Sequence, residues 1–210
     1  MKIIFLGAPG AGKGTQADKV SERLGSPTIS TGAIIRSALK EGTKMGLEAK
    51  KFVEQGALVP DEIVIGIVKE RLAESDCDKG YILDGFPRSV PQAQVLDEMG
   101  IKLDCVLSLE VSDETIVERM SGRRVCPGCG KSYHIASLPS AKGELCEVCD
   151  TALIIRADDA PDVVRSRLEI YHSTTEPLKD YYREKGNLVE VYGADAVEET
   201  TERTFKALGI

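Results

Sequence analysis

Short apolar runs alternate along the chain with segments in which apolar residues recur every three or four positions. The first run covers residues 2–6 and stops at Gly7, as is typical of a strand buried inside a parallel sheet. Residues 13–24 follow with the periodicity of a helix, which Gly25 is suited to end. Similar runs predict further strands at residues 28–30, 81–83, 105–109 and 188–192. The alternation favours an α/β fold, with a parallel sheet covered by helices on both faces.

Capping residues predict where several other helices begin and end. Asp61 can cap a helix that carries apolar residues as far as Leu72, and Pro161 suits the first turn of a long helix. Asp195 and Glu198 are spaced as a capping pair for the last helix. The remaining helices are expected around residues 34–39, around Phe52 and Val53 with a stop near Gly56, from about Ser89, and from Ser112 or Asp113 to Gly122.

Residues 123–159 break the alternating pattern. Prolines, glycines and paired cysteines replace the helical periodicity there. This segment therefore reads as a small subdomain inserted into the α/β chain.

Composition narrows the class of protein. The chain has 210 residues, of which 42% are apolar and 29% charged, so disordered, collagen-like and coiled-coil proteins are excluded. Its formal net charge of −7 argues against non-specific binding to nucleic acid or to an anionic membrane. No apolar stretch approaches the roughly 18 residues that a membrane span needs. The first apolar run is too short for a signal peptide, so a cytoplasmic location is expected.

A glycine-rich loop joins the first strand to the first helix. Its sequence from Gly7 to Gln16 is GAPGAGKGTQ. Glycines allow successive backbone N–H groups to converge on a phosphate, and the helix N-terminus adds partial positive charge. The usual loop has a hydroxyl residue directly after the lysine, whereas here Gly14 intervenes before Thr15. The residues expected to hold a nucleotide polyphosphate are Gly10, Ala11, Gly12, Lys13, Gly14 and Thr15.

Two cysteine pairs lie inside the inserted segment. Cys126 and Cys129 form the first pair, and Cys146 and Cys149 follow at the spacing of a zinc ribbon. Four thiolates fill a tetrahedral shell, so the metal is expected to be structural Zn²⁺. Because this shell is complete, a surface role is expected for the neighbouring His134.

The departure at Gly14 points to a family. A loop of the form Gly-x-Pro-Gly-x-Gly-Lys-Gly-Thr resembles that of the nucleoside monophosphate kinases, the adenylate kinases in particular. The resemblance implies a P-loop three-layer fold with a five-stranded parallel sheet and a zinc-binding lid. It also implies that ATP, carrying Mg²⁺, transfers a phosphoryl group to AMP to give two ADP.

Several further motifs resemble the acceptor side of these kinases. Residues 31–36 are similar to the family's Thr-Gly-Asp-x-x-Arg, with Ala33 in place of the usual Asp. We expect this replacement to alter local hydrogen bonding without loss of function. Asp84 ends an apolar strand and would hold the water shell of Mg²⁺. By resemblance, the AMP-binding residues are Thr31, Arg36, Ala57, Leu58, Val59, Gly85, Phe86, Pro87, Arg88, Gln92, Arg156 and Arg167.

Arginines gather in the sequence around the insertion. Arg supplies a planar fork of donors that stays charged, as the charge developing in phosphoryl transfer requires. For Arg124, a solvated salt bridge is an equally good interpretation. The resemblance assigns ATP contacts to Arg119, Arg123, Ser132, Tyr133 and Asp195. The expected catalytic residues are Lys13, Asp84, Arg88, Arg123, Arg156 and Arg167.

The resemblance also divides the chain. It implies a core of residues 1–29, 60–121 and 160–210, an AMP-binding segment of residues 30–59 and a lid of residues 122–159. A monomer is expected, with no nucleic-acid or membrane partner.

Two alternatives stay open at this point. A sibling kinase would act on UMP, CMP or GMP, although Gln92 and residues 57–59 favour AMP. A zinc-ribbon nucleic-acid-binding protein would need a basic stripe. Residues 123–159 instead hold five basic and five acidic side chains.

Overall fold

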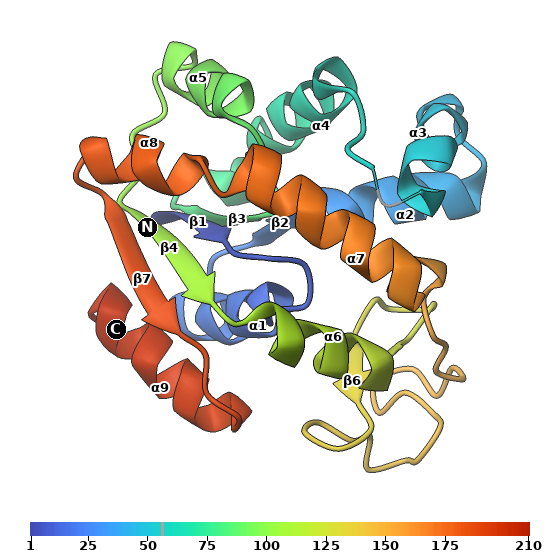
Figure 1. Ribbon diagram of the computed structural model, residues 1–210. Helices are drawn as coiled ribbons and strands as arrows, with labels where there is room; N and C mark the ends of the chain where they lie inside the picture. The colour runs from blue at the N-terminus through green and yellow to red at the C-terminus, as the bar shows by residue number, and fades with distance from the viewer. Residues whose placement is uncertain (56) are drawn as a thin grey trace.

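A computed structural model of the protein describes residues 1–55 and 57–210. Its centre is a five-stranded sheet in which every neighbouring pair is parallel (Figure 1). The strand order is β2 (Thr28–Ser30), β3 (Tyr81–Asp84), β1 (Lys2–Leu6), β4 (Cys105–Glu110) and β7 (Leu188–Tyr192). The predicted α/β architecture and its five strands are therefore confirmed.

Both faces of the sheet are buried. Along β1, Ile3 and Phe5 face one apolar cluster and Ile4 and Leu6 face the other. Helices α1 (Lys13–Leu24) and α9 (Val197–Leu208) cover the first face, side by side in Figure 1. Helices α4 (Asp61–Leu72), α5 (Val90–Glu98) and α8 (Leu178–Glu184) cover the second. Burial on both faces explains why these strands read as continuous apolar runs.

A helical hairpin follows β2. Helices α2 (Thr31–Glu41) and α3 (Lys44–Glu54) pack closely, because a Cβ at Gly46 would lie only 2.2 Å from the carbonyl oxygen of Ala38. Only glycine permits this approach of the two backbones. The helix predicted to stop near Gly56 ends at Glu54, and Gly56 itself lies outside the described residues.

The inserted segment begins where helix α6 (Asp113–Gly122) ends. It contains a short antiparallel pair, β5 (Arg123–Val125) and β6 (Ser132–His134), that the sequence pattern did not predict. The chain returns through η2 (Ala157–Asp159) to α7 (Pro161–Ile170), and a π-helical stretch, η3 (Tyr171–Thr175), leads into α8. Figure 1 shows the insertion beyond the ends of α6 and α7. A short helix η1 (Ser75–Cys77) precedes β3.

Two predicted helix caps are wrong. Pro60 is the N-cap of α4, and Asp61 is its first helical residue. Ala196 is the N-cap of α9, and no side chain among the described residues caps that end. In place of the predicted Asp195 pair, the hydroxyl of Thr200 accepts a hydrogen bond from the Ala194 N–H at 2.9 Å. Of the two candidate caps of α6, Ser112 is confirmed, since its side chain accepts from the Thr115 N–H. The helix expected from about Ser89 is also confirmed, and Ser89 is its N-cap.

In the described part of the chain, no helix combines the length and apolar character required to cross a bilayer.

Candidate active site

The phosphate loop occupies the carboxyl end of β1, where the strand order reverses. Ligands of open parallel sheets bind at such positions. Gly12, the N-cap of α1, has a φ of +101°, which favours glycine. At Gly7 a Cβ would lie 2.5 Å from the carbonyl oxygen of Leu109. The glycines therefore allow the loop to close tightly over the neighbouring strand.

Lys13 curls back over this loop. Its Nζ donates to the carbonyl oxygens of Gly7 and Ala8, at 2.7 and 2.9 Å. Burial lowers the pKa of Lys13 to about 8, although the nearby Asp84 carboxylate raises it. Because burial disfavours the charged amine, an anionic ligand would raise this pKa again.

Arg88, Arg167 and Arg123 lie close enough to Lys13 to lower its pKa, and Arg36 and Arg156 adjoin these arginines. Burial lowers the pKa of Arg88, and neighbouring Arg167 and Arg36 lower it further. Burial, with repulsion from Arg36 and Arg123, lowers the pKa of Arg156 to about 10. Such an excess of buried positive charge is costly unless an anion accompanies it. We call these residues the cationic cluster, and its members are Lys13, Arg36, Arg88, Arg123, Arg156 and Arg167.

Two aspartates orient part of this cluster. Arg123 forms a bidentate pair with the fully buried Asp159, in which its Nε donates to Oδ2 at 2.8 Å. Arg167 Nη1 donates two hydrogen bonds to Asp158, one to its carboxylate at 2.8 Å and one to its backbone carbonyl at 3.0 Å. Sequence reasoning missed both aspartates. The available signal was an Asp-Asp pair two residues after Arg156, inside an arginine-rich segment.

Thr31 and Arg88 meet at one carbonyl group. The hydroxyl of Thr31 and Nε of Arg88 both donate to the oxygen of Gly85, each at 2.9 Å. The side chain of Phe86 points into the core and is 1% exposed. A ligand at this loop would therefore contact the backbone and Arg88 rather than the ring of Phe86.

Gln92 lies in the first turn of α5 and is 1% exposed. Its Oε1 accepts from the Arg88 N–H at 2.7 Å, and its Nε2 donates to Asp61 Oδ1 at 2.6 Å. Among the predicted residues 57–59, Val59 is buried in the same apolar cluster as Phe86. The structure thus links Arg88, Gln92 of α5 and Asp61 of α4 through hydrogen bonds.

Asp84 ends β3 beside the phosphate loop. Ser30 Oγ donates to its Oδ2 at 3.4 Å, and that oxygen would lie 3.8 Å from a Cβ at Gly14. A single carboxylate next to a phosphate loop fits Mg²⁺, which is commonly bound through one carboxylate, several waters and the phosphates themselves.

The structure splits the arginines that the sequence grouped around the insertion. Arg119 stands apart from the cationic cluster, because its Nη2 donates to the Ala194 carbonyl at 2.8 Å, next to exposed Asp195. Arg124 donates to the backbone carbonyls of Ser121 and Arg123. Two regions are therefore separate, a buried centre and a more open edge.

Tyr133 lies in the apolar core of the insertion. It is 4% exposed, and its hydroxyl lies 3.3 Å from Cys146 Sγ and accepts from the Glu147 N–H at 2.9 Å. The expected contact of Tyr133 with ATP stays a prediction, and the ring itself is covered by the insertion. Ser132, its neighbour in β6, is half-buried and pairs with Val125.

The four predicted cysteines come together. Their Sγ atoms lie within 4.8 Å of one another, with Cys126 and Cys149 at 3.3 Å and Cys129 and Cys146 at 3.5 Å. Tetrahedral zinc with Zn–S bonds of about 2.3 Å requires sulfurs about 3.8 Å apart, so the geometry suits Zn²⁺. The imidazole of His134 is engaged elsewhere, because its Nδ1 accepts from the N–H groups of Ala136 and Ser137.

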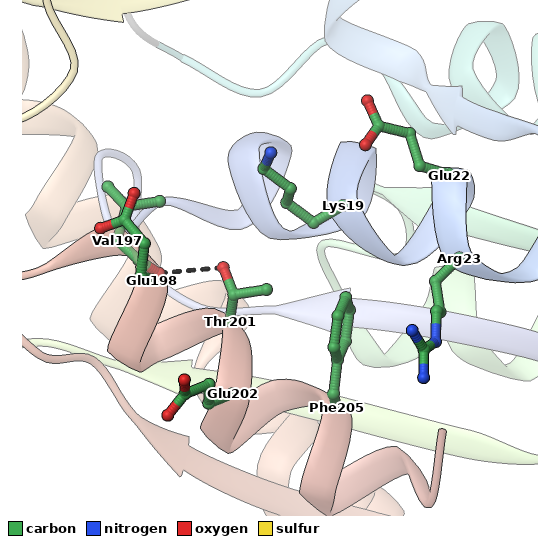
Figure 2. A pocket seen from close by; sticks show the side chains of 8 residues that line it. All are labelled: Lys19, Glu22, Arg23, Val197, Glu198, Thr201, Glu202 and Phe205. Carbon is green, nitrogen blue, oxygen red and sulfur yellow. Dashed lines mark hydrogen bonds between the residues drawn. The ribbon is translucent and has the colours of Figure 1, made fainter.

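A groove between α1 and α9 contains none of the predicted site residues. Figure 2 shows Lys19 and Arg23 on one side of it and Glu198 and Phe205 on the other. Arg23 lies over the Phe205 ring at 5.7 Å. Because the groove is open and is lined by side chains of both charges, we interpret it as an ordinary interface between two helices.

Comparison with known proteins gives a consistent result. The family model for adenylate kinase matches residues 5–187. A protein named adenylate kinase from Caldicellulosiruptor bescii is 52% identical, and one from Ruminiclostridium cellulolyticum is 51% identical. Another, from Caldicellulosiruptor saccharolyticus, is 50% identical. Each alignment covers 100% of both chains.

Proposed function

Since the chain belongs to the adenylate kinase family and is a phosphotransferase, we propose that it transfers a phosphoryl group reversibly from Mg²⁺-ATP to AMP, giving two ADP. The observation that carries this proposal is the buried cationic cluster between the phosphate loop and Gln92. It supplies positive charge at the point where two nucleotides would meet. Phosphoryl transfer depends mainly on positioning and on stabilising developing charge.

ATP would bind with its phosphates in the glycine loop. The N–H groups of residues 10–15 would surround them, and Lys13 would release Gly7 and Ala8 to contact the outer phosphates. The edge formed by Arg119 and residues 193–195 would receive the adenine. Residues 132–133 would then contribute backbone atoms rather than the Tyr133 ring.

AMP would bind on the opposite side of the cluster. Thr31, Arg36 and Arg88 would hold its phosphate. Gln92 would form hydrogen bonds with the edge of the adenine, and residues 57–59 would contact the base. No general base is required, because a phosphate monoester with a second pKa of about 6 is already largely ionised near neutral pH.

Arg123, Arg156 and Arg167 would neutralise the group in transfer. The Nε of Arg156 is a buried atom without a hydrogen-bond partner within residues 1–55 and 57–210, so it is available to an incoming oxygen. Mg²⁺ travelling with ATP would add charge neutralisation, and Asp84 would hold its water shell.

Water must be kept from the transferring group, because it would otherwise accept the phosphoryl group. The insertion and the α2–α3 hairpin already touch, since Lys40 Nζ donates to the Pro127 carbonyl at 3.1 Å. Residues 122–159 would act as a lid and residues 30–59 as an AMP-binding segment, both closing against the core of residues 1–29, 60–121 and 160–210. Zn²⁺ in the lid would be structural, holding this small region folded. We place the enzyme in the cytoplasm as a monomer.

An assay of ADP formation with ATP fixed and AMP, GMP, CMP or UMP as acceptor tests this function. AMP should have the highest kcat/KM, and Arg88→Ala should raise the KM for AMP roughly 10- to 100-fold while changing the KM for ATP less. Preference for another monophosphate would favour a sibling kinase. A salt-dependent shift of DNA or RNA, without kinase activity, would favour the zinc-ribbon alternative.

A further inference from the structure

The Gln92 amide is held by two partners that differ in chemistry. A backbone N–H, that of Arg88, donates to Oε1 at 2.7 Å, and a carboxylate, that of Asp61, accepts from Nε2 at 2.6 Å. An N–H group can only donate and an ionised carboxylate can only accept. The assignment of oxygen and nitrogen in this buried amide is therefore determined by its neighbours, and a flipped amide would oppose both.

Both partners are themselves fixed. The Arg88 carbonyl accepts from the Thr175 hydroxyl at 2.8 Å, which ties this backbone to the π-helical stretch η3. Asp61 is the first residue of α4, and its carboxylate bonds to Gln92 across to α5 instead of capping its own helix. The bond thus joins two separate helices at the predicted acceptor site.

With respect to the described residues, the fixed amide retains one donor and one acceptor. A glutamine amide has two N–H donors and two oxygen lone pairs, and one of each is already used here. The positions of this remaining N–H donor and oxygen acceptor are fixed, because the amide cannot flip. Together they complement adenine, whose amino group donates beside an accepting ring nitrogen, and they oppose hypoxanthine and guanine, which present a carbonyl oxygen beside a ring N–H.

We infer that Asp61 is a specificity-determining positioning residue, which holds the Gln92 amide in the orientation that accepts 6-aminopurine and rejects 6-oxopurine monophosphates. This inference rests on the proposed AMP site. A site whose buried polar groups would be left opposed or unpaired discriminates strongly between such analogues. Cytosine shares the polarity of adenine on a smaller ring, so Asp61 should contribute little to its rejection.

The test compares wild type with Asp61→Ala, using AMP, IMP and CMP as acceptors or competing inhibitors at fixed ATP. We expect Asp61→Ala to raise the KM for AMP about tenfold and to reduce the preference for AMP over IMP about tenfold. The KM for ATP and the preference for AMP over CMP should change less than threefold, because neither depends on the amide's polarity. Asp61→Asn, which keeps an accepting carbonyl oxygen, should return both values toward wild type.

Glu62→Ala is the matched control, since it removes an exposed carboxylate from the same helical turn. Glu62→Ala should leave the KM or inhibition constants for AMP, IMP and CMP unchanged. If Asp61→Ala is too unstable to assay, Asp61→Ser, which is too short to reach Gln92, gives the same readout. An unchanged AMP-to-IMP preference with only a lower melting temperature would overturn the inference. A wild-type enzyme that does not prefer AMP would instead overturn the proposed function.

Discussion

The cationic cluster and the four-cysteine site suit ligands of opposite charge. In the first, buried guanidinium groups and Lys13 repel one another, and in the described part of the chain Asp158 and Asp159 form ion pairs with two of them, Arg123 and Arg167. In the second, four sulfurs converge at a distance that suits a metal ion. Excess positive charge can be relieved by a transient anion, such as a nucleotide. A thiolate shell needs a resident cation. The first region should therefore govern activity and the second stability.

The largest expected effect is on activity, from Lys13→Ala. We expect kcat/KM to fall by at least about 100-fold, because one charged donor to the transferring phosphates is lost. The melting temperature of the free enzyme should stay constant or rise, since a buried and incompletely paired charge is removed. Steady-state kinetics and thermal unfolding of the same sample check this. A large loss of stability with activity retained would reverse the roles given to the two regions.

Cys126→Ser should produce the complementary result. Cys126 is buried, and loss of one metal ligand should cost about 2 kcal/mol or more, lowering the melting temperature by about 4–8 °C. Activity measured well below that temperature should persist, because the cationic cluster is intact. Cys105→Ala, a buried cysteine outside the metal site, serves as the control for metal content. Full metal loss with an unchanged unfolding curve would contradict a structural metal.

Tyr133→Phe sharpens the comparison, because it removes only the hydroxyl that contacts Cys146. A hydrogen bond to a metal-binding side chain typically contributes a factor of at least ten in metal affinity, so the Kd for Zn²⁺ should rise about tenfold. Competition with a chromophoric chelator measures this. Tyr182→Phe is the matched control, since the Tyr182 hydroxyl is buried but has no hydrogen-bond partner in the described chain. Equal Zn²⁺ affinities in the two variants would exclude this role.

The smallest effect is expected at His172, which belongs to neither the cationic cluster nor the four-cysteine site. Hydrogen bonds with Glu176 and Asp113 raise the pKa of His172 above its usual 6.5. The stabilisation is therefore fully present below pH 6.5 and is lost as the pH rises through the folded-state pKa. His172→Gln should lower the melting temperature by about 1–3 °C at pH 5.5 and hardly at all at pH 9. A difference that grows with pH would refute this assignment.

Much of the fold followed from local pattern. The central strands are apolar on both faces, and Gly25 and Ser112 end or begin helices through contacts within a few residues. The spacing of the cysteines likewise predicted that the four thiols would lie together. The family motifs named the members of the cationic cluster, but the sequence also grouped Arg119 and Arg124 with them, and these two lie apart. These features depend on neighbours in sequence or on a recognised pattern.

The rest depended on contacts between distant residues. Asp61 was interpreted as a helix cap, yet its carboxylate contacts Gln92, which lies 31 positions further along the chain. Asp159 is buried because Arg123 meets it from the start of the insertion. The Tyr133 ring turned inward because a thiol and a backbone N–H engage its hydroxyl. None of these contacts leaves a periodic signal in the sequence.

The most direct test of the central claim is calorimetric titration of the zinc-loaded enzyme with a dinucleotide in which five phosphates join two adenosines. A buried cluster that spans donor and acceptor phosphates predicts one-to-one binding that both ATP and AMP compete for. It also predicts that Lys13→Ala and Arg88→Ala each weaken this binding by at least about tenfold. Binding that competes with ATP alone, or that neither substitution weakens, would contradict the claim.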